Sequence, residues 1–392
     1  MASNRNRNIF VARVVDEPQI GDFTQSVTIQ PFDGTDNSFD NKFFNMQGDF
    51  DNTYIKLVTS KYKDIHYGDV LSVSGTTTAP RNFGSQNGRT FDYVDYLLKD
   101  NIISIVRSND VSVIKTSGVS VTGLLFKMKG IFMNSIRQVL GEPEASLAGG
   151  LVVGEKDSLG KELLNDFRKV GLIHIVVLSG YNITIIATTI QRILSFLPEV
   201  LGNILGGIGI ILFGVLVGGG ATVVRSCIMA IIAIISGMIG RRYEPARALI
   251  VAALIMIFIN PLVILYDPSF QLSFVATAGL IWLSPFVGKL FQWVPEKFGM
   301  RELVISTTST QLAVTPLLVH MMGQISVLGV FANILVLPLI PVTMLFISLT
   351  GIAGIFSIWA SWPFAAVTHL FLSYELFIVT KFAAIPWVSI SF

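Results

Sequence analysis

Charged residues are scarce in this chain of 392 amino acids. They make up 14% of the sequence against 52% hydrophobic residues, and the mean hydropathy is +0.64. Soluble globular domains carry roughly 25% charged residues. The scarcity excludes an ordinary soluble protein and indicates a polytopic membrane protein. The net charge of +2 implies neither a strongly basic nor a strongly acidic partner.

Cysteine and histidine are also rare. Cys227 is the one cysteine, so the chain cannot form an internal disulfide, and its apolar neighbours favour a buried packing role. The four histidines, His66, His174, His320 and His369, lack the HxxxH or HxH spacing of metal sites, so we predict no metal and no cofactor. The sequence GxxxxGK[ST] is missing, which excludes a P-loop ATPase.

The first 118 residues differ from the rest in composition. They hold 12 Lys and Arg against 14 Asp and Glu, a net charge of −2, whereas the remainder holds 16 against 12, a net of +4. Turn signals separate β-branched segments, which predicts strands over 9–15, 26–30, 52–59, 69–75 and 102–107. A helix is predicted over 91–101. This content indicates a small β-barrel of the OB type in residues 1–118.

Two amphipathic segments occupy residues 119–171. The first, 121–140, has one apolar face, with Lys127, Lys129 and Arg137 elsewhere on the helix. It is too charged to span a bilayer comfortably and is predicted to lie in the membrane interface. The second, 158–171, also has an apolar stripe at helical spacing.

Residues 172–392 contain the long apolar runs of a transmembrane domain. About 20 residues cross a bilayer, and eight segments approach that length: 172–190, 200–217, 223–239, 249–266, 270–286, 303–320, 334–355 and 364–382. The predicted fold class is therefore a polytopic α-helical membrane protein with an N-terminal small β-barrel (OB-like) domain.

The charges in the loops predict how the spans are oriented. The strongest positive cluster, Arg241, Arg242 and Arg247, belongs in the cytoplasm. Counting spans back from this cluster puts the β domain outside. The polar start of the chain, MASNRNRN, is no secretory signal, so we expect one or more helices to precede Met1 in the natural protein.

The segment HIVVLSGYN brings polar residues into the first predicted span. On a continuous helix, His174, Ser179 and Asn182 would share one broad polar face. Alternatively, Gly180 breaks the helix and frees backbone groups to line a wet cavity. These residues can equally serve as hydrogen-bonding contacts between helices. A Ser179–His174 protease dyad is disfavoured, because no base lies at a reliable spacing.

Other candidates for a polar path lie further along the chain. Polar groups within spans are functional hypotheses by default. Arg225 either snorkels to the outer interface or lines a path for an anion. Asp267 either belongs to such a path or caps the helix that begins at Pro268. Gln271, Ser273, Gln311 and Asn333 complete the candidates within the spans, and Glu155, Lys156 and Asp157 form a charged loop.

Several segments together resemble the signature of the ComEC family, the membrane proteins of DNA internalisation in natural transformation. The family's GLLLG-D, AGL-H and ISGLHV segments correspond to the stretch LAGGLVVGEKDSLGKELLNDFRKVGLIHIVVLSGYNITII. Its further patterns correspond to VVRSCIMA, DPSFQLSF and GQISVLGVFANILVLPLIP. GDVLSVSG followed by NGRTFDYVDYLLKDNI resembles the OB-like domain that precedes the membrane core in that family.

Two departures limit what the resemblance implies. The family's second histidine, in SGLH, is Asn182 here, preceded by Tyr181. An acid–base or ligand role of that histidine is therefore missing, whereas a hydrogen-bonding role survives. Many members end in a metallo-β-lactamase-like domain, but this chain has no HxHxDH motif. We predict neither nuclease nor other enzyme activity for it.

The resemblance implies a channel that carries single-stranded DNA into the cytoplasm across the bacterial cytoplasmic membrane. Its partners would be the DNA, the lipid membrane, and a separate nuclease, DNA receptor and cytoplasmic motor. Midplane polar residues fit a transporter of another polar or anionic solute equally well. An assembly platform without a conducting path is a third alternative.

Overall fold

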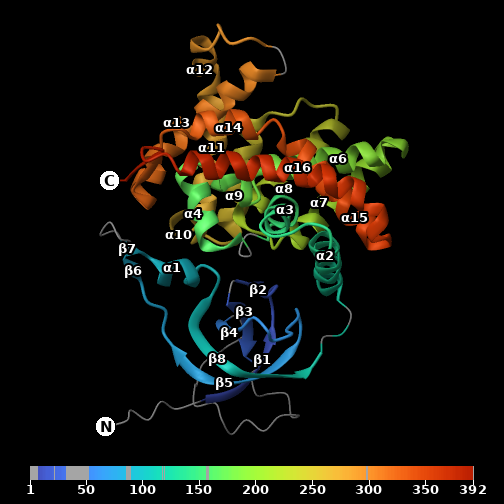
Figure 1. Ribbon diagram of the computed structural model, residues 1–392, viewed down its shortest axis with the longest axis vertical. Helices are drawn as coiled ribbons and strands as arrows, with labels where there is room; N and C mark the ends of the chain where they lie inside the picture. The colour runs from blue at the N-terminus through green and yellow to red at the C-terminus, as the bar shows by residue number, and fades with distance from the viewer. Residues whose placement is uncertain are drawn as a thin grey trace. The chain divides into compact units, whose positions relative to one another are not determined.

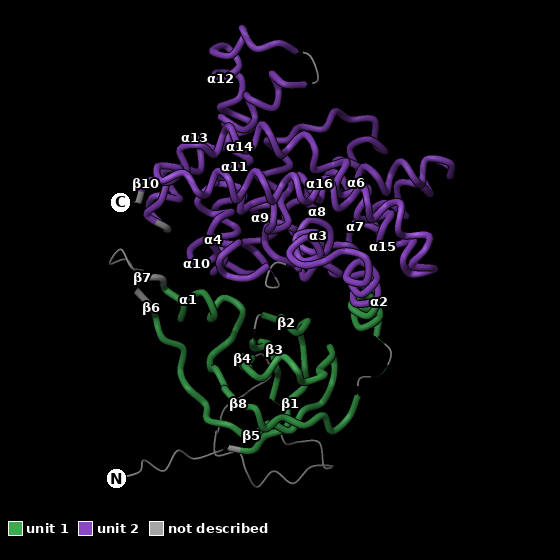
Figure 2. The backbone as a smooth tube through the Cα atoms, viewed as in Figure 1, with its two compact units in different colours: residues 1–128 green, residues 129–392 purple. Residues whose placement is uncertain are grey.

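The computed structural model describes residues 8–21, 23–31, 53–84, 90–116, 118, 120–155, 159–296 and 299–391. The chain divides into two compact units, Met1–Met128 and Lys129–Phe392 (Figure 2). The division falls within helix α2, Val121–Arg137. The first unit is built mainly of strands and the second mainly of helices.

A six-stranded sheet forms the first unit. Its strands are β1 (Asn8–Val14), β2 (Gln19–Ile20), β3 (Thr24–Pro31), β4 (Tyr54–Ser60), β5 (Val70–Thr78) and β8 (Ile102–Lys115). Their order is β1-β5-β8-β4-β3-β2, and β1 also pairs with β3. The β4–β8 pair is parallel, while β1 pairs antiparallel with both β5 and β3. Figure 1 shows β5 and β8 as long curved strands.

Alternation of side chains explains why these segments are strands. Every second residue of β4 is buried, including Ile55 and Leu57, and β5 contributes Leu71 and Val73 to the same core. The four strands predicted over 9–15, 26–30, 52–59 and 69–75 are confirmed with small shifts, since β1 ends at Val14, β4 begins at Tyr54 and β5 begins at Val70. Residue 52 lies outside the described residues.

The last strand and the helix before it differ in length from the predictions. β8 extends to Lys115, beyond the predicted end at residue 107, because it pairs with β5 along most of its length. Polar residues in SNDVSVIK conceal this strand in the sequence. Helix α1, Tyr93–Leu98, is shorter than predicted, because the Asp92 side chain caps it by accepting a hydrogen bond from the Asp95 backbone. The short strands β6 (Phe83–Gly84) and β7 (Thr90–Phe91) pair with each other.

The second unit contains the remaining helices (Figure 1). They are α3 (Glu144–Val153), α4 (Lys161–Val170), α5 (Ile173–Val176), α6 (Gly180–Ile193), α7 (Glu199–Leu216), α8 (Ala221–Met238), α9 (Pro245–Ile259), α10 (Val263–Tyr266), α11 (Pro268–Trp282), α12 (Ser284–Leu290), α13 (Met300–Met322), α14 (Gly329–Val336), α15 (Ile340–Phe356) and α16 (Ile358–Ala383). The short strands β9 (Gln324–Ser326) and β10 (Ser389–Ser391) pair antiparallel, which joins the segment after α16 to the segment before α14.

Fewer segments of the structure have the length and composition of a span than the eight predicted. Four segments in the described part of the chain are long and apolar enough to cross a membrane: Ile173–Phe196, α7, α8 and α16. The count rises to six if α11 with α12, bent by 55°, and α14 with α15, bent by 50°, each form one span. These apolar helices are compatible with a multi-pass membrane protein.

Two of the predicted spans are not among these segments, for different physical reasons. The segment 249–266 is divided because α9 ends at Ile259. Its C-cap Asn260 is extended and precedes Pro261, and the Asn260 side chain accepts a hydrogen bond from the Leu262 backbone. Helix α13 is long enough, with 23 residues. It is not among the candidate spans because hydroxyl-bearing residues in its first half lower its mean hydropathy.

Two hydrophobic clusters hold the helical unit together. The larger joins residues of α2 to α5 with those of α14 to α16, and the smaller joins α6, α7 and α8. Cys227 belongs to the smaller cluster, where its thiol lies 3.6 Å from the Ile210 carbonyl oxygen. The prediction that Cys227 is a buried packing residue is confirmed.

The close approach of α11 and α13 predicts that Gly279→Ala destabilises the helical unit. A Cβ at Gly279 would overlap Ala313 Cβ and lie 3.0 Å from the Ser309 carbonyl oxygen. Overpacking of this kind costs about 1–3 kcal/mol. The measurement is thermal unfolding of the purified chain in detergent. Gly237→Ala in α8 is the control, because a Cβ there meets nothing within 4 Å. Equal midpoints for the two variants would contradict the packing.

Candidate anion site at a helix break

The HIVVLSGYN segment is a broken helix. α5 ends at Val176, Val177 is extended with φ −84° and ψ 117°, and α6 begins at Gly180. The expectation of one continuous helix is therefore wrong. The helix is broken, as the alternative has it, but the break lies at Val177–Ser179 and Gly180 is the first residue of α6. Ser179 explains where α6 starts, because its hydroxyl oxygen accepts a hydrogen bond from the Asn182 backbone N–H, as an N-cap residue does.

Asn182 fastens this break to a neighbouring helix. Its side-chain oxygen accepts a hydrogen bond from the Ser179 hydroxyl at 3.1 Å. Its side-chain nitrogen donates to the Leu151 carbonyl in α3 at 3.3 Å. Asn182 is 1% exposed. In this structure both polar ends of its side chain are engaged, and the Ser179 hydroxyl is directed at Asn182 rather than at His174.

Gly180 allows a guanidinium group to lie against the backbone of the break. A Cβ at this position would lie 2.5 Å from Nη2 of Arg225 and 3.0 Å from the Ser226 hydroxyl. Any larger residue would have to displace the Arg225 side chain. Ser179 therefore ends the extended segment by capping α6, and Gly180, which has no Cβ, leaves room for the Arg225 guanidinium.

Arg225 is buried, with 6% of its surface exposed, on helix α8. Its Nε donates a hydrogen bond to the Ser273 hydroxyl at 2.6 Å, and its Nη2 to the Ser226 hydroxyl at 3.2 Å. Its Nη1 lies 3.3 Å from the Met229 sulfur, and the Phe274 ring centroid is 6.0 Å from the guanidinium carbon. Arg225 is thus enclosed by side chains of the helical unit.

The charge of Arg225 has no carboxylate partner within the described part of the chain. Burial raises the pKa of the nearby Tyr243 hydroxyl, between α8 and α9, and the charge of Arg225 only partly opposes this, so Tyr243 stays neutral. A guanidinium has five N–H donors. These three contacts use one hydrogen on each nitrogen, so one on Nη1 and one on Nη2 have no acceptor among the described residues.

The start of α11 supports Arg225 from one side. Asp267 caps this helix, with its Oδ1 accepting hydrogen bonds from the backbone N–H groups of Ser269 and Phe270. Gln271 donates from its side chain to the last carbonyls of the preceding α10. The Thr222 and Ser269 hydroxyls lie 3.0 Å apart. Helices α8 and α11 are thus joined at their N-terminal turns, which sets Ser273 beside Arg225.

Arg225 and the helix break lie in a part of the chain that is similar to known proteins. The model of the family described as "Competence protein" matches residues 151–392, which include the helix break, Arg225 and the start of α11. The chain belongs to the competence protein family. The resemblance to ComEC that the sequence motifs indicate is thereby confirmed.

The chain is also similar to a named protein. ComE operon protein 3 of Bacillus subtilis (strain 168) is 25% identical over 279 residues, which cover 70% of this chain. The aligned part is 34% of that protein, so the chain spans about a third of its relative's length. No solved structure matches the chain significantly.

The other predicted site residues that the structure describes are not among the hydrogen-bond partners of Arg225. His174, on α5, is exposed. Glu155 accepts a hydrogen bond from Arg137 at 2.8 Å, while Lys156 and Asp157 lie outside the described residues. Gln311 and Asn333 form no side-chain hydrogen bond with Arg225 in the described part of the chain. The Asn333 side-chain oxygen is buried without a partner there.

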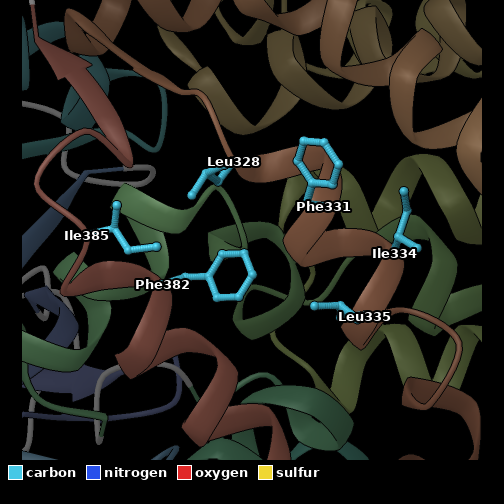
Figure 3. A pocket seen from close by; sticks show the side chains of 6 residues that line it. All are labelled: Leu328, Phe331, Ile334, Leu335, Phe382 and Ile385. Carbon is cyan, nitrogen blue, oxygen red and sulfur yellow. The ribbon is translucent and has the colours of Figure 1, made fainter.

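An apolar groove of about 440 Å³ lies elsewhere, between α14 and the end of α16. Figure 3 shows Phe382 and Ile385 across from the α14 side chains. Its lining residues are Leu328, Phe331, Ile334, Leu335, Phe382 and Ile385. None of them is polar, so the groove offers nothing to an anion. The described residues also include no group of three or more His, Cys, Asp or Glu side chains that could hold a metal ion.

Sequence reasoning missed several polar contacts of the helical unit. Ser226 stands next to Arg225 in VVRSCIMA, and this adjacency was the available signal. Glu375 in α16 is 1% exposed and bonds to Thr343 in α15. A lone carboxylate in an apolar run of 26 residues was the signal there.

The Asn182 contacts predict that Asn182→Ala loosens the helix break. The substitution removes the donor to the Leu151 carbonyl and leaves buried polar groups unsatisfied, which costs about 1–3 kcal/mol. Thermal unfolding in detergent measures the effect. The control is Thr188→Ala, because the exposed Thr188 hydroxyl bonds only to carbonyls of its own helix. An Asn182→Ala protein as stable as Thr188→Ala would show that Asn182 does not hold the break.

Proposed function

We propose that this chain forms a membrane path through which single-stranded DNA enters the cytoplasm. The observation that carries the proposal is the buried guanidinium of Arg225, which has no carboxylate partner among the described residues and lies against a helix break. Membership of the competence protein family supports a role in DNA uptake. The phosphates of the strand are the anions that the two remaining N–H groups of Arg225 would meet.

The balance of charge suits transport better than tight binding. Phosphate contacts dominate the affinity of proteins for nucleic acid, and each adds to it. A pore must bind well enough to admit its cargo and weakly enough to release it. One arginine among hydroxyl groups, such as those of Ser226 and Ser273, meets both requirements. The backbone groups freed between Val177 and Ser179 would add neutral donors and acceptors.

The first unit would act on the outer side of the cytoplasmic membrane as an OB-like barrel. In support, each of β1, β3, β4, β5 and β8 pairs with two others of this set, in a cyclic order with one parallel pair. That arrangement suits a five-stranded Greek-key barrel. The second unit would carry the multi-pass path, with the loop of Arg241, Arg242 and Arg247 in the cytoplasm.

The proposal gives no residue of this chain a catalytic role. Strand degradation, DNA capture and pulling from the cytoplasm would belong to a separate nuclease, a receptor and a motor. His174, Gln311 and Asn333 stay candidates for the lining of the path. Asn182, Asp267 and Gln271 are proposed as residues that position the helices around Arg225.

A transporter of another polar or anionic solute is the second candidate. The observation that favours it is again the Arg225 site, because a guanidinium receives carboxylates and sulfates as readily as phosphates. Vesicles that contain the purified chain distinguish the two. Short single-stranded DNA that enters them in an Arg225-dependent manner supports the first function. Entry of small anions alone supports the second.

Arg225 variants test the proposed function in cells that take up labelled DNA through this protein. Arg225→Ala is expected to reduce uptake by about 10- to 100-fold, the equivalent of the roughly 1.5–3 kcal/mol of a charged hydrogen bond. Arg225→Lys is expected to retain part of the uptake, because lysine keeps the charge but loses the planar fork. Gly180→Ala should also lower uptake by displacing the guanidinium while the charge remains.

The matched control is Arg192→Ala, which removes an arginine that is exposed at the end of α6. It should leave uptake unchanged. Protein levels in the membrane are measured alongside, so that a folding defect is recognised. Normal uptake in Arg225→Ala cells with normal protein levels would refute the proposal.

A further inference from the structure

Glu375 is a buried carboxyl group outside the Arg225 site. It lies on α16, one of the helices long and apolar enough to cross a membrane, and is 1% exposed. Its Oε1 lies 2.7 Å from the Thr343 hydroxyl in α15. Neither a lysine, an arginine nor a histidine pairs with it in the described part of the chain.

A seam of buried polar side chains joins α15 to α16. Thr343 meets Glu375, and seven residues further on, Thr350 meets Thr368 with their hydroxyls 2.9 Å apart. The two pairs step forward along α15 and backward along α16, so the helices are antiparallel. The Ser361 hydroxyl adds a bond to the Thr350 carbonyl at 2.9 Å. Each of these side chains is 0% or 1% exposed.

The contacts of Glu375 match a neutral acid. A carboxylic acid has one proton to place, and Thr343 Oγ1 can accept it. The Thr343 hydroxyl then donates to the Leu339 carbonyl, which lies 3.1 Å away. A carboxylate would instead have about four acceptor positions and a single hydroxyl to fill them, in a buried place without a cation.

Glu375 contacts α15 close to the bend between α14 and α15. Leu339 is the N-cap of α15, at the break where α14 and α15 meet at 50°. Thr343 lies one turn into α15, so Glu375 holds the first turn after the break. On the other side of the break, α14 carries Asn333, a candidate lining residue whose buried side-chain oxygen has no partner among the described residues.

The charged groups near Glu375 are few. α14 and α15 contain no titratable residue. The one on α3 is Glu144, which contacts His369 and Ser373 on another face of α16. Lys381 and Tyr374 share α16 with Glu375. The charged residues of α4, which are exposed or half-buried, are Lys161, Glu162, Asp166, Arg168 and Lys169. None of them bonds to Glu375.

We propose that Glu375 is a proton-binding site of the helical unit. As a carboxylic acid it holds α15 against α16 at the α14–α15 bend. When it gives its proton to water and becomes a carboxylate, the buried charge separates the two helices at this turn. The ligand is the proton, and the arrangement described here is the proton-bound one. The site does not depend on DNA transport.

Infrared spectroscopy of the purified full chain tests the bound proton directly. Exposed Asp and Glu side chains are ionised at about pH 6, since their pKa values lie near 4. The wild-type chain should nevertheless retain a carboxylic-acid carbonyl band at that pH. Glu375→Gln should lose this band entirely, and Glu144→Gln should retain it. A wild-type spectrum without the band, or a Glu375→Gln spectrum that keeps it, would overturn the proposal.

Cross-linking tests whether the proton controls helix contact. The Phe346 and Phe371 rings face each other across α15 and α16, with centroids 6.2 Å apart. Phe346→Cys and Phe371→Cys are combined with Cys227→Ser, and cross-linking rates are compared with and without Glu375→Gln at each pH. The cross-linking rate of the chain that keeps Glu375, divided by the rate of the chain with Glu375→Gln, should be near one at about pH 6. This ratio should fall roughly tenfold by about pH 9. A constant ratio would refute the release of the helices.

Discussion

The burial of the Arg225 guanidinium constrains the packing of α6, α8 and α11. A buried charge without an opposite charge is costly, by several kcal/mol. The protein offsets part of this cost with hydroxyl groups from Ser226 and Ser273 and with the aromatic face of Phe274. Gly180 is required because the guanidinium lies against the backbone there. The helix break, the α8–α11 contact and the donors left on Nη1 and Nη2 all meet where this charge lies.

Much of this site could be predicted from the sequence, because polar residues are conspicuous in apolar runs. Gly180, Arg225 and Ser273 were all candidates, and the structure brings them together. The partner of Asn182 could not be predicted, because it is a backbone carbonyl 31 residues away that any residue type would supply. The division of the segment 249–266 could not be predicted, because hydropathy does not register a Pro-induced break such as that after Ile259. The length of β8 was underestimated because pairing with β5 overrides the polar residues in its second half.

Arg225 and Glu375 are two buried ionisable groups whose surroundings suit different charge states. Arg225 keeps its charge, since a guanidinium does not lose its proton. Its surroundings supply acceptors and leave donors free. Glu375 meets only one hydroxyl, which suits an uncharged acid. The first group would therefore be occupied by an anion and the second by a proton. Both lie beside a discontinuity in a helix, where small movements change which backbone groups are exposed.

The most direct measurement of the central idea is contact between the passing strand and the helix break. A photoreactive amino acid at Tyr181, which is 48% exposed and adjacent to Gly180, reports on this position. The same amino acid at Ile208, 47% exposed on α7, is the control. Illumination during uptake should join labelled single-stranded DNA to the protein from position 181 and not from position 208. Efficient uptake with no adduct from position 181 would contradict the account.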